Sequence, residues 1–420
     1  MDNNNGFYRQ AQRLQDAAYD VRNPKIREAR IFIEQHIRLE MAKFPGQRIK
    51  RLHSWHIGNP PYFGINPPEE IDQLLQEIKI QYGYSNAQGI EEAIEAIYRY
   101  HYRQNFFGLK KENIFLTDGV SEGIRIVLTD CLNPGDEMLL PTPNYPLWRL
   151  FVQLTGAIPV HYACDEQASW YPDIADIQKK INGRTKALLL INPNNPTGAV
   201  YPREILEQII NLARKHSLII FADEIYNEVL YGQARHTAIA SLADDVLIFT
   251  LNGLSKNRLM PGIRSGWIAI TGPTHRAQDL INGINLITNA RLCPNIFGQL
   301  VIPLILPRDD YLQPLLLPGG RLYDQITTAQ KAINQSEELS CVPAAAAMYL
   351  YVKINGKIKI DNDEKFILDL LNNERVQVVQ GTGFDDKNLP RHFRIVCLAP
   401  VDELKEGIGR IISFIQNYKN

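Results

Sequence analysis

The sequence predicts an α/β fold, with a large domain on a mostly parallel sheet flanked by helices and a smaller α+β domain. Three observations support this prediction. Short apolar segments alternate with amphipathic segments from about residue 70 onward, polar motifs directly follow several apolar segments, and the pattern changes at a proline-rich joint at 306–321. Strands covered by helices on both faces are brief and apolar throughout, as these segments are.

Composition excludes several classes of protein. The chain has 420 residues, and 45 Lys and Arg balance 46 Asp and Glu, so no charge excess is available for nucleic acid or an anionic membrane. Five widely spaced cysteines contain no CxxC pair, which argues against a disulfide framework. The N-terminus lacks an apolar signal core, and three prolines interrupt the longest apolar stretch, about 292–307. We therefore expect a soluble, cytoplasmic protein.

The first expected element is a helix at 24–43 that places Ile26, Ala29, Ile33 and Ile37 on one face. This helix has no sheet of its own, so we expect it to pack on the smaller domain or on a partner chain. The large domain is expected to span 50–310. Its predicted helices are 90–106, 121–132 and 202–216, and its predicted strands are 137–140, 187–191, 218–222, 246–251 and 267–270.

The smaller domain is expected to combine an N-terminal part, 1–49, with a C-terminal part, 311–420. The C-terminal pattern predicts a helix near 321–336, a strand pair around 347–354, a helix near 363–374, strands around 375–379 and 393–398, and a final helix.

Three motifs directly follow three of the predicted strands. They are NPNNPTG at 192–198, DEIY at 223–226 and NGLSKNRLMPGIRSGW at 252–267. Ligands of parallel α/β sheets bind beyond the carboxyl ends of the strands. The three motifs are therefore predicted to meet at one edge of the sheet and to form a single site.

The residue types in these motifs suit a cofactor with a pyridine ring. A lysine in a partly dry site can have a lowered pKa and form a Schiff base with an aldehyde, and Lys256 is the candidate. Asp223 could keep the ring nitrogen protonated. Asn195 and Tyr226 could donate hydrogen bonds to a phenolic oxygen on that ring.

A phosphate on the cofactor would require a fixed cation and a helix N-terminus. Arg264 offers the cation. Gly119, Val120 and Ser121 precede or begin a predicted helix and offer backbone and hydroxyl donors.

Each candidate is also compatible with a purely structural role. Lys256 could be a surface lysine, Asp223 and Ser121 could cap helices, and NPNNPTG could be an ordinary turn-rich loop. Tyr145 could be a core aromatic residue, and Tyr84 could be a structural loop tyrosine.

Together the motifs resemble those of the class I aminotransferases, which are pyridoxal 5′-phosphate enzymes of fold type I. The resemblance rests on NPNNPTG, DEIY and the spacing of Lys256 and Arg264 around Gly262 and Gly266. It extends over nearly the whole chain, including IGNP at 57–60, GVSE at 119–122 and PGGRLY at 318–323, and is closest to the bacterial alanine aminotransferases.

The resemblance implies transamination, with L-alanine and 2-oxoglutarate giving pyruvate and L-glutamate. In that reading Lys256, Asp223 and Tyr226 are catalytic, and Lys256 carries the cofactor as a Schiff base. The cofactor-binding set it implies is Gly119, Val120, Ser121, Tyr145, Asn195, Asp223, Tyr226, Ser255, Lys256, Arg264 and Tyr84.

The resemblance also implies a substrate site and a homodimer. Arg394 would bind the substrate α-carboxylate, Asn195 and the loop at Gly58 would contact substrate, and Tyr19 and Arg22 would lie on an N-terminal segment over the site. Tyr84 would reach the phosphate of the neighbouring subunit. No metal, nucleic acid or membrane partner is implied.

The sequence departs from that family's pattern at a few positions. Gly253 stands where many members have a serine, Ala346 stands where glycine is usual, and Asn257-Arg258 replaces a common Thr-Tyr pair.

Three alternatives remain open. They are an aminotransferase for valine or aromatic amino acids, a pyridoxal-phosphate lyase of the same fold, and a non-catalytic effector domain of a transcription regulator. The last would require an added helix-turn-helix domain.

Overall fold

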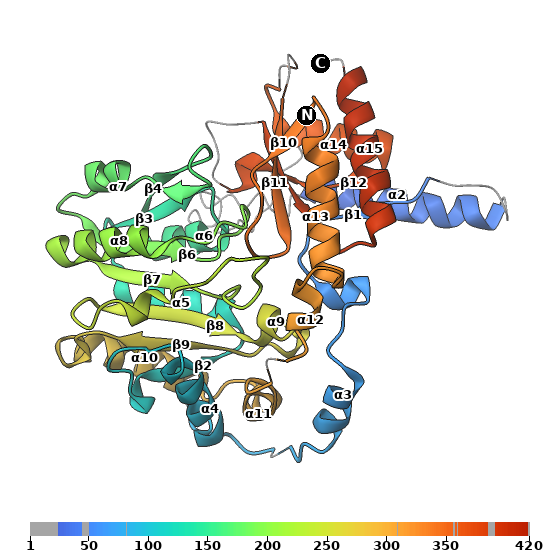
Figure 1. The fold of residues 1–420 in the computed structure, drawn as a ribbon. Coiled ribbons are helices and arrows are strands. Elements are labelled where there is room, and N and C mark those ends of the chain that lie inside the picture. The colour runs from blue at the N-terminus through green and yellow to red at the C-terminus, as the bar shows by residue number, and fades with distance from the viewer. Residues whose placement is uncertain are drawn as a thin grey trace, which may run out of the picture.

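The computed structural model describes residues 24–43, 50–80, 82–308, 310–355, 358, 360–384 and 391–418 (Figure 1). A large sheet and a small sheet lie side by side, each with its own helices. The strands of the large sheet are β2 (Ile114–Thr117), β3 (Glu137–Thr142), β4 (Ile158–Asp165), β5 (Tyr171–Pro172), β6 (Thr185–Ile191), β7 (Ile219–Asp223), β8 (Ile248–Gly253) and β9 (Gly266–Thr271).

The large sheet is mostly parallel, as predicted. Its strand order is β2-β9-β8-β7-β6-β3-β4-β5. The run from β8 to β4 is parallel, whereas β9 is antiparallel to both of its neighbours and β5 is antiparallel to β4. Since β6, β7 and β8 are adjacent and parallel, their carboxyl ends meet at one edge, where the three motifs begin.

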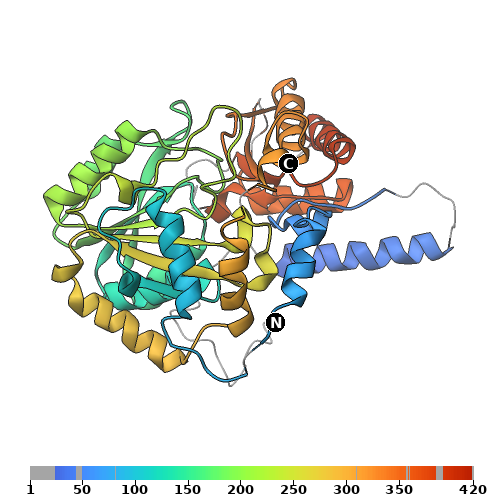
Figure 2. The same ribbon diagram turned by 60° about the horizontal axis from the view of Figure 1, so that its bottom comes forward.

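Helices cover both faces of the large sheet (Figure 2). Alternate residues of each strand enter two separate hydrophobic clusters; in β6, for example, Leu188 and Leu190 enter one and Leu189 and Ile191 the other. The first cluster includes side chains from α4 (Glu91–Tyr102), α7 (Ile174–Lys180), α8 (Arg203–His216) and α11 (Ile296–Ile305). The second includes side chains from α5 (Val120–Cys131), α6 (Leu147–Thr155) and α10 (Gln278–Arg291). This two-sided burial explains why the strands are apolar throughout.

The small sheet has the order β10-β11-β14-β13 and is antiparallel. Its strands are β10 (Leu339–Cys341), β11 (Tyr349–Ile354), β13 (Val379–Gln380) and β14 (His392–Val396), and its helices include α13 (Arg321–Asn334), α14 (Asp363–Glu374) and α15 (Val401–Asn417). A separate parallel pair joins β1 (His53–Ser54) to β12 (Val376–Gln377). Two short helices, α3 (Glu69–Gln76) and α12 (Gln313–Leu316), lie in the connections between the sheets.

The N-terminal helix α2 (Pro24–Lys43) packs against α14, which confirms the expected contact with the C-terminal unit. Ile26 and Ile33 are buried in the same cluster as the small sheet, and Ala29 and Ile37 pack against it. The rest of the helix extends away from the molecule (Figure 1). None of the described helices combines the length and the apolar character that a membrane crossing demands.

The sequence patterns misplaced or missed some elements. The helix expected at 90–106 ends at Tyr102, since Asn105 and Gly108 have positive φ and turn the chain; its buried face uses Tyr100 rather than Tyr98. Strands β2, β4 and β5 were not predicted. Most residues of β4 are exposed or half-buried, which reflects its place near the edge of the sheet.

Candidate active site

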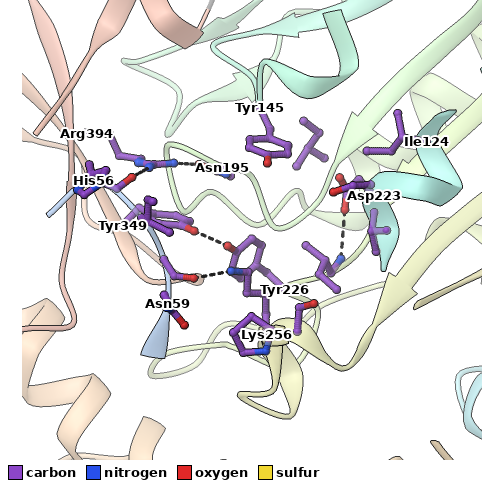
Figure 3. A pocket seen from close by; sticks show the side chains of 18 of the residues that line it. His56, Asn59, Ile124, Tyr145, Asn195, Asp223, Tyr226, Lys256, Tyr349 and Arg394 are labelled. Carbon is purple, nitrogen blue, oxygen red and sulfur yellow. Dashed lines mark hydrogen bonds between the residues drawn. The ribbon is translucent and has the colours of Figure 1, made fainter. Parts of the chain in front are cut away.

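A cavity of about 540 Å³ lies at the carboxyl ends of β6, β7 and β8, where the large domain meets the small one (Figure 3). Residues from all three predicted motifs line it, together with the start of α5, the loop after β1 and two strands of the small sheet. The lining includes Gly58, Val120, Ser121, Tyr145, Asn195, Asp223, Tyr226, Ser255, Lys256, Arg264 and Arg394. Most of the predicted site residues are therefore brought together by the fold.

Lys256 lies on a short helix, α9 (Leu254–Asn257), that directly follows β8. Its Nζ donates a hydrogen bond to the carbonyl oxygen of Gly58 at 2.6 Å. Burial lowers the pKa of Lys256, and the positive charges of Arg394 and Arg264 lower it further, while Tyr349 opposes the shift. A lysine with a lowered pKa holds a larger fraction of free amine, which is the form that attacks a carbonyl and accepts a proton.

Asp223 ends β7 and is only 3% exposed. One carboxylate oxygen accepts a hydrogen bond from Trp148 Nε1 at 3.0 Å, and the other accepts one from the Ile225 amide at 3.4 Å. Burial raises the pKa of Asp223 to about 6, although these two donors oppose the shift. Within the described ranges no cation pairs with this carboxylate, so the site offers a buried negative charge that a bound cation would stabilise.

Tyr226 follows Asp223 in the DEIY motif, and its hydroxyl lies 2.5 Å from the hydroxyl of Tyr349 on β11. Burial raises the pKa of Tyr226. The ring of Tyr226 also lies 5.9 Å from Lys256 Nζ. The side chain of Tyr226 is thus close both to the lysine and to Tyr349 of the small sheet (Figure 3).

Arg394 lies on β14 and is 3% exposed. Its guanidinium donates to Asn195 Oδ1 at 2.9 Å and to the carbonyl oxygen of His56 at 2.6 Å, while its Nε is buried without an acceptor. No carboxylate of the described chain pairs with it. A buried guanidinium held only by neutral acceptors suits a carboxylate ligand, which would bind it through two parallel hydrogen bonds.

The N-terminus of α5 forms the other charged end of the cavity. Gly119 precedes the helix with φ of 78°, and Arg264 lies so close that a Cβ on Gly119 would come within 2.3 Å of its Nη2. A Cβ on Gly266 would likewise meet the Gly119 backbone at 2.8 Å. These glycines let an exposed arginine approach the helix N-terminus, a combination that attracts an anion. In the part of the chain that the structure describes, Arg264 forms no ion pair.

Gly119 and Tyr84 are not among the residues that line this cavity, and two further predicted residues lie outside the described part of the chain. Tyr84 is 81% exposed and lies outside the lining of its own chain's site. Tyr19 and Arg22 lie outside the described residues.

Three further residues were missed by the sequence analysis. Tyr349 and His56 line the cavity, and Trp148 binds Asp223 from behind it. Trp148 follows the PNYP segment that carries Tyr145, and a buried indole needs an acceptor for its N–H, so this signal was available. His56 contacts Arg394 through its backbone carbonyl oxygen, and a pattern of side chains in the sequence cannot predict a backbone contact.

These residues fit pyridoxal 5′-phosphate. A buried carboxylate without a counter-charge matches the protonated ring nitrogen, and the α5 N-terminus with Arg264 matches the phosphate. Lys256 supplies the amine that reacts with the aldehyde. The Asp223 carboxylate and the positively charged end at Arg264 thus each have a complementary group on the same ligand.

Comparison with known proteins agrees with this fit. A family model described as aminotransferase class I and II matches residues 51–411. The chain is 43% identical over 416 residues to the alanine aminotransferase of Mycobacterium tuberculosis (strain ATCC 25618 / H37Rv), covering 98% of this chain and 94% of that protein. It is 40% identical over 408 residues to the glutamate-pyruvate aminotransferase AlaA of Escherichia coli (strain K12), covering 97% of each.

A solved structure is equally similar. An aminotransferase from Escherichia coli has a TM-score of 0.92 and 39% sequence identity, and the match covers 99% of this chain and 100% of that one.

Proposed function

Because the chain belongs to the class I and II aminotransferases, we propose that it transfers the amino group of L-alanine to 2-oxoglutarate, giving pyruvate and L-glutamate. Enzymes of this family use pyridoxal 5′-phosphate. The observation that supports the proposal most strongly is the shared cavity. It is lined by a lysine of lowered pKa, a buried aspartate and a buried arginine, and neither of the last two has an ion-pair partner in the described chain. The names of two curated relatives favour alanine as the amino donor.

The cofactor supplies, when bound, an electron-withdrawing ring that takes up the electron pair left when a Cα–H bond of the amino acid breaks. With the cofactor bound, Asp223 would keep the ring nitrogen protonated. Lys256 would take the proton from Cα and deliver it to the cofactor carbon to which the amino group is transferred, since its lowered pKa leaves the amine free to act as a base. Arg394 binds the substrate carboxylate and so orients the bond that breaks.

The remaining site residues bind and orient. Tyr226 and Asn195 would donate hydrogen bonds to the phenolic oxygen of the cofactor, Tyr145 would hold its ring, and Arg264 would bind its phosphate. The phosphate donors proposed alongside Arg264 are Gly119, Val120, Ser121 and Ser255. Gly58 leaves room for the substrate backbone, and Tyr19 and Arg22 contact substrate from the N-terminal segment.

The active unit is proposed to be a cytoplasmic homodimer in which Tyr84 reaches the phosphate of the neighbouring site. The 81% exposure of Tyr84, outside its own cavity, is consistent with this. The proposed domains are 50–310 and the combination of 1–49 with 311–420. Most buried side chains of the small sheet gather in one hydrophobic cluster and most of those of the large sheet in two others, which supports this division.

The function can be tested with purified protein loaded with pyridoxal 5′-phosphate. L-alanine added without any oxo acid should release about one pyruvate per site and shift the visible absorbance, and 2-oxoglutarate should restore the spectrum. L-glutamate, L-valine and L-tyrosine are compared as donors. Lys256→Ala is the control, and we expect it to bind the cofactor but release no pyruvate.

Other results would favour other functions. A faster reaction with L-valine or L-tyrosine would replace alanine as the donor. Products other than the matching oxo acid would indicate a lyase, and a protein that takes up no cofactor would favour a non-catalytic role.

A further inference from the structure

Tyr349, the first residue of β11, is buried where the two domains meet and is 3% exposed. Its hydroxyl lies 2.5 Å from the hydroxyl of Tyr226, and the guanidinium carbon of Arg394 lies 4.4 Å from the centre of its ring. One side chain therefore contacts both a group proposed to bind the cofactor and the group proposed to bind the substrate carboxylate (Figure 3).

The backbone, rather than a flexible side chain, sets these contacts. Tyr351 pairs with Arg394 across β11 and β14, so Tyr349 is the diagonal neighbour of Arg394 on the same sheet face. Ahead of Tyr349, the Ala347 amide donates to the carbonyl oxygen of Val229 at 2.9 Å. The segment that leads into Tyr349 is thus tied to the loop that follows Tyr226.

The loop at Gly58 packs directly against the same hydroxyl. A Cβ at Gly58 would lie 2.2 Å from the Tyr349 hydroxyl oxygen, so only glycine fits without movement. The carbonyl of Gly58 is also the acceptor for Lys256 Nζ. Tyr349 therefore lies next to Tyr226, next to Arg394 and next to the Gly58 loop that accepts the hydrogen bond from Lys256.

The hydroxyls of Tyr349 and Tyr226 share one hydrogen bond, in which either can be the donor. Burial alone would raise the pKa of Tyr349, but the positive charges of Lys256 and Arg394 outweigh it and lower this pKa. Burial raises the pKa of Tyr226. A hydrogen bond donated by Tyr349 would leave the hydroxyl proton of Tyr226 free to be donated into the cavity.

We infer that Tyr349 is a positioning residue with two separable roles: its hydroxyl orients Tyr226 as a donor toward the cofactor, and its ring holds the Arg394 guanidinium in place for the substrate carboxylate. The ring of Phe384, 4.9 Å from the Arg394 guanidinium carbon, assists the second role. This inference rests on the proposed function and assigns a residue to it.

Tyr349→Phe tests the first role, because it removes the hydroxyl and keeps the ring. The visible absorbance of the cofactor-loaded protein is titrated with pH. We expect the midpoint to rise by roughly half a pH unit, since Tyr226 becomes a weaker donor and the deprotonated form loses stabilisation. Propionate, which is alanine without its amine, should bind the loaded protein within about twofold of wild type by calorimetry.

Tyr349→Leu tests the second role by removing the ring as well. It should shift the titration in the same way and also weaken propionate binding by about tenfold, the loss expected for one cation–π contact in a desolvated site. Tyr231→Phe is the matched control, since it removes a buried hydroxyl that donates to the Ala347 carbonyl at 2.7 Å in the same interdomain contact. It should lower the melting temperature while leaving both site measurements unchanged.

Three outcomes would overturn the inference: a wild-type titration midpoint in Tyr349→Phe, an equal shift in Tyr231→Phe, or wild-type propionate affinity in Tyr349→Leu. Failure of the proposed function can be told apart from failure of this inference. A cofactor-loaded wild-type protein that releases no pyruvate from L-alanine can still be titrated by absorbance and tested for propionate binding.

Discussion

At the residue scale, the cavity is organised around charged groups whose partners the described chain does not supply. Asp223 and Arg394 are each 3% exposed, and neither has an ion-pair partner within the described ranges. Burying an uncompensated charge costs free energy, so the protein without its ligands is less stable than its packing alone would allow. The expected gain is affinity, because each ligand group meets a partner that has already lost its water.

Asp223→Asn should separate the loss of stability caused by the buried charge from the gain in ligand affinity. The pKa of Asp223 is about 6 in the folded protein and 3.8 in the unfolded chain, so ionisation destabilises the fold as pH rises from about 4 to 6, and fully above 6. Without cofactor, the free energy of unfolding of the variant should therefore be up to about 3 kcal/mol larger than that of wild type at pH 7.5. This difference should vanish near pH 4. Urea unfolding at both pH values measures it.

The same substitution should weaken cofactor binding, because asparagine cannot stabilise a protonated ring nitrogen. Asp173→Asn is a suitable control, since Asp173 caps α7 through two backbone amides and asparagine caps a helix about as well. Equal stability of the wild type and Asp223→Asn at pH 7.5 would contradict the argument.

At the element scale, two close approaches shape the anion end of the site. Gly266→Ala should push β9 away from the α5 N-terminus, because its Cβ would lie 2.8 Å from backbone atoms of Gly119 and Val120. We expect about tenfold weaker binding of pyridoxal 5′-phosphate, or about 1.4 kcal/mol, measured by fluorescence titration. Gly262→Ala, four residues earlier and with open space around its Cβ, should bind normally. Equal losses in both variants would remove the steric explanation.

A second element-scale feature lies behind the lysine. Arg258, one of the residues that departs from the family pattern, is buried and pairs with Glu228, which also accepts from the Tyr100 hydroxyl at 2.6 Å. Arg258 also donates to the carbonyl of Leu306 at 2.8 Å. The pair thus joins α9 to the loop after β7 and to the end of α11.

Arg258→Met should lower the free energy of unfolding by about 3 kcal/mol, because it leaves the Glu228 charge without its partner. Arg258→Met combined with Glu228→Gln should recover much of that loss, which chemical denaturation of both variants can measure. A double variant as unstable as the single one would show that packing, rather than charge, is responsible.

At the scale of the whole molecule, the proposed dimer makes Tyr84 part of the neighbouring site. Mixed dimers of Lys256→Ala and Tyr84→Ala chains should contain one intact site, since the first chain supplies Tyr84 to the Lys256 of the second. After unfolding and refolding together, the mixture should regain activity that neither variant has alone at limiting cofactor. If Tyr84 serves its own chain, mixing restores nothing.

Much of this molecule was predictable from the chain because its signals are local. The strands β6, β7 and β8 are apolar throughout, and the motifs follow them directly, so a parallel sheet was enough to bring Asn195, Asp223 and Lys256 to one edge. In helix α2, the spacing of apolar residues such as Ile26 and Ile33 predicted the buried face. Periodicity and position along the chain carried this information.

Contacts between distant segments could not be read in the same way. The pairing of Tyr349 with Tyr226, the carbonyl of His56 on Arg394 and the indole of Trp148 on Asp223 each join separate parts of the chain. Local patterns in the chain were enough to predict which chemical groups reach the edge of the sheet. The orientation and desolvation of those groups could be seen only in the folded molecule, because both properties depend on long-range packing between the two domains.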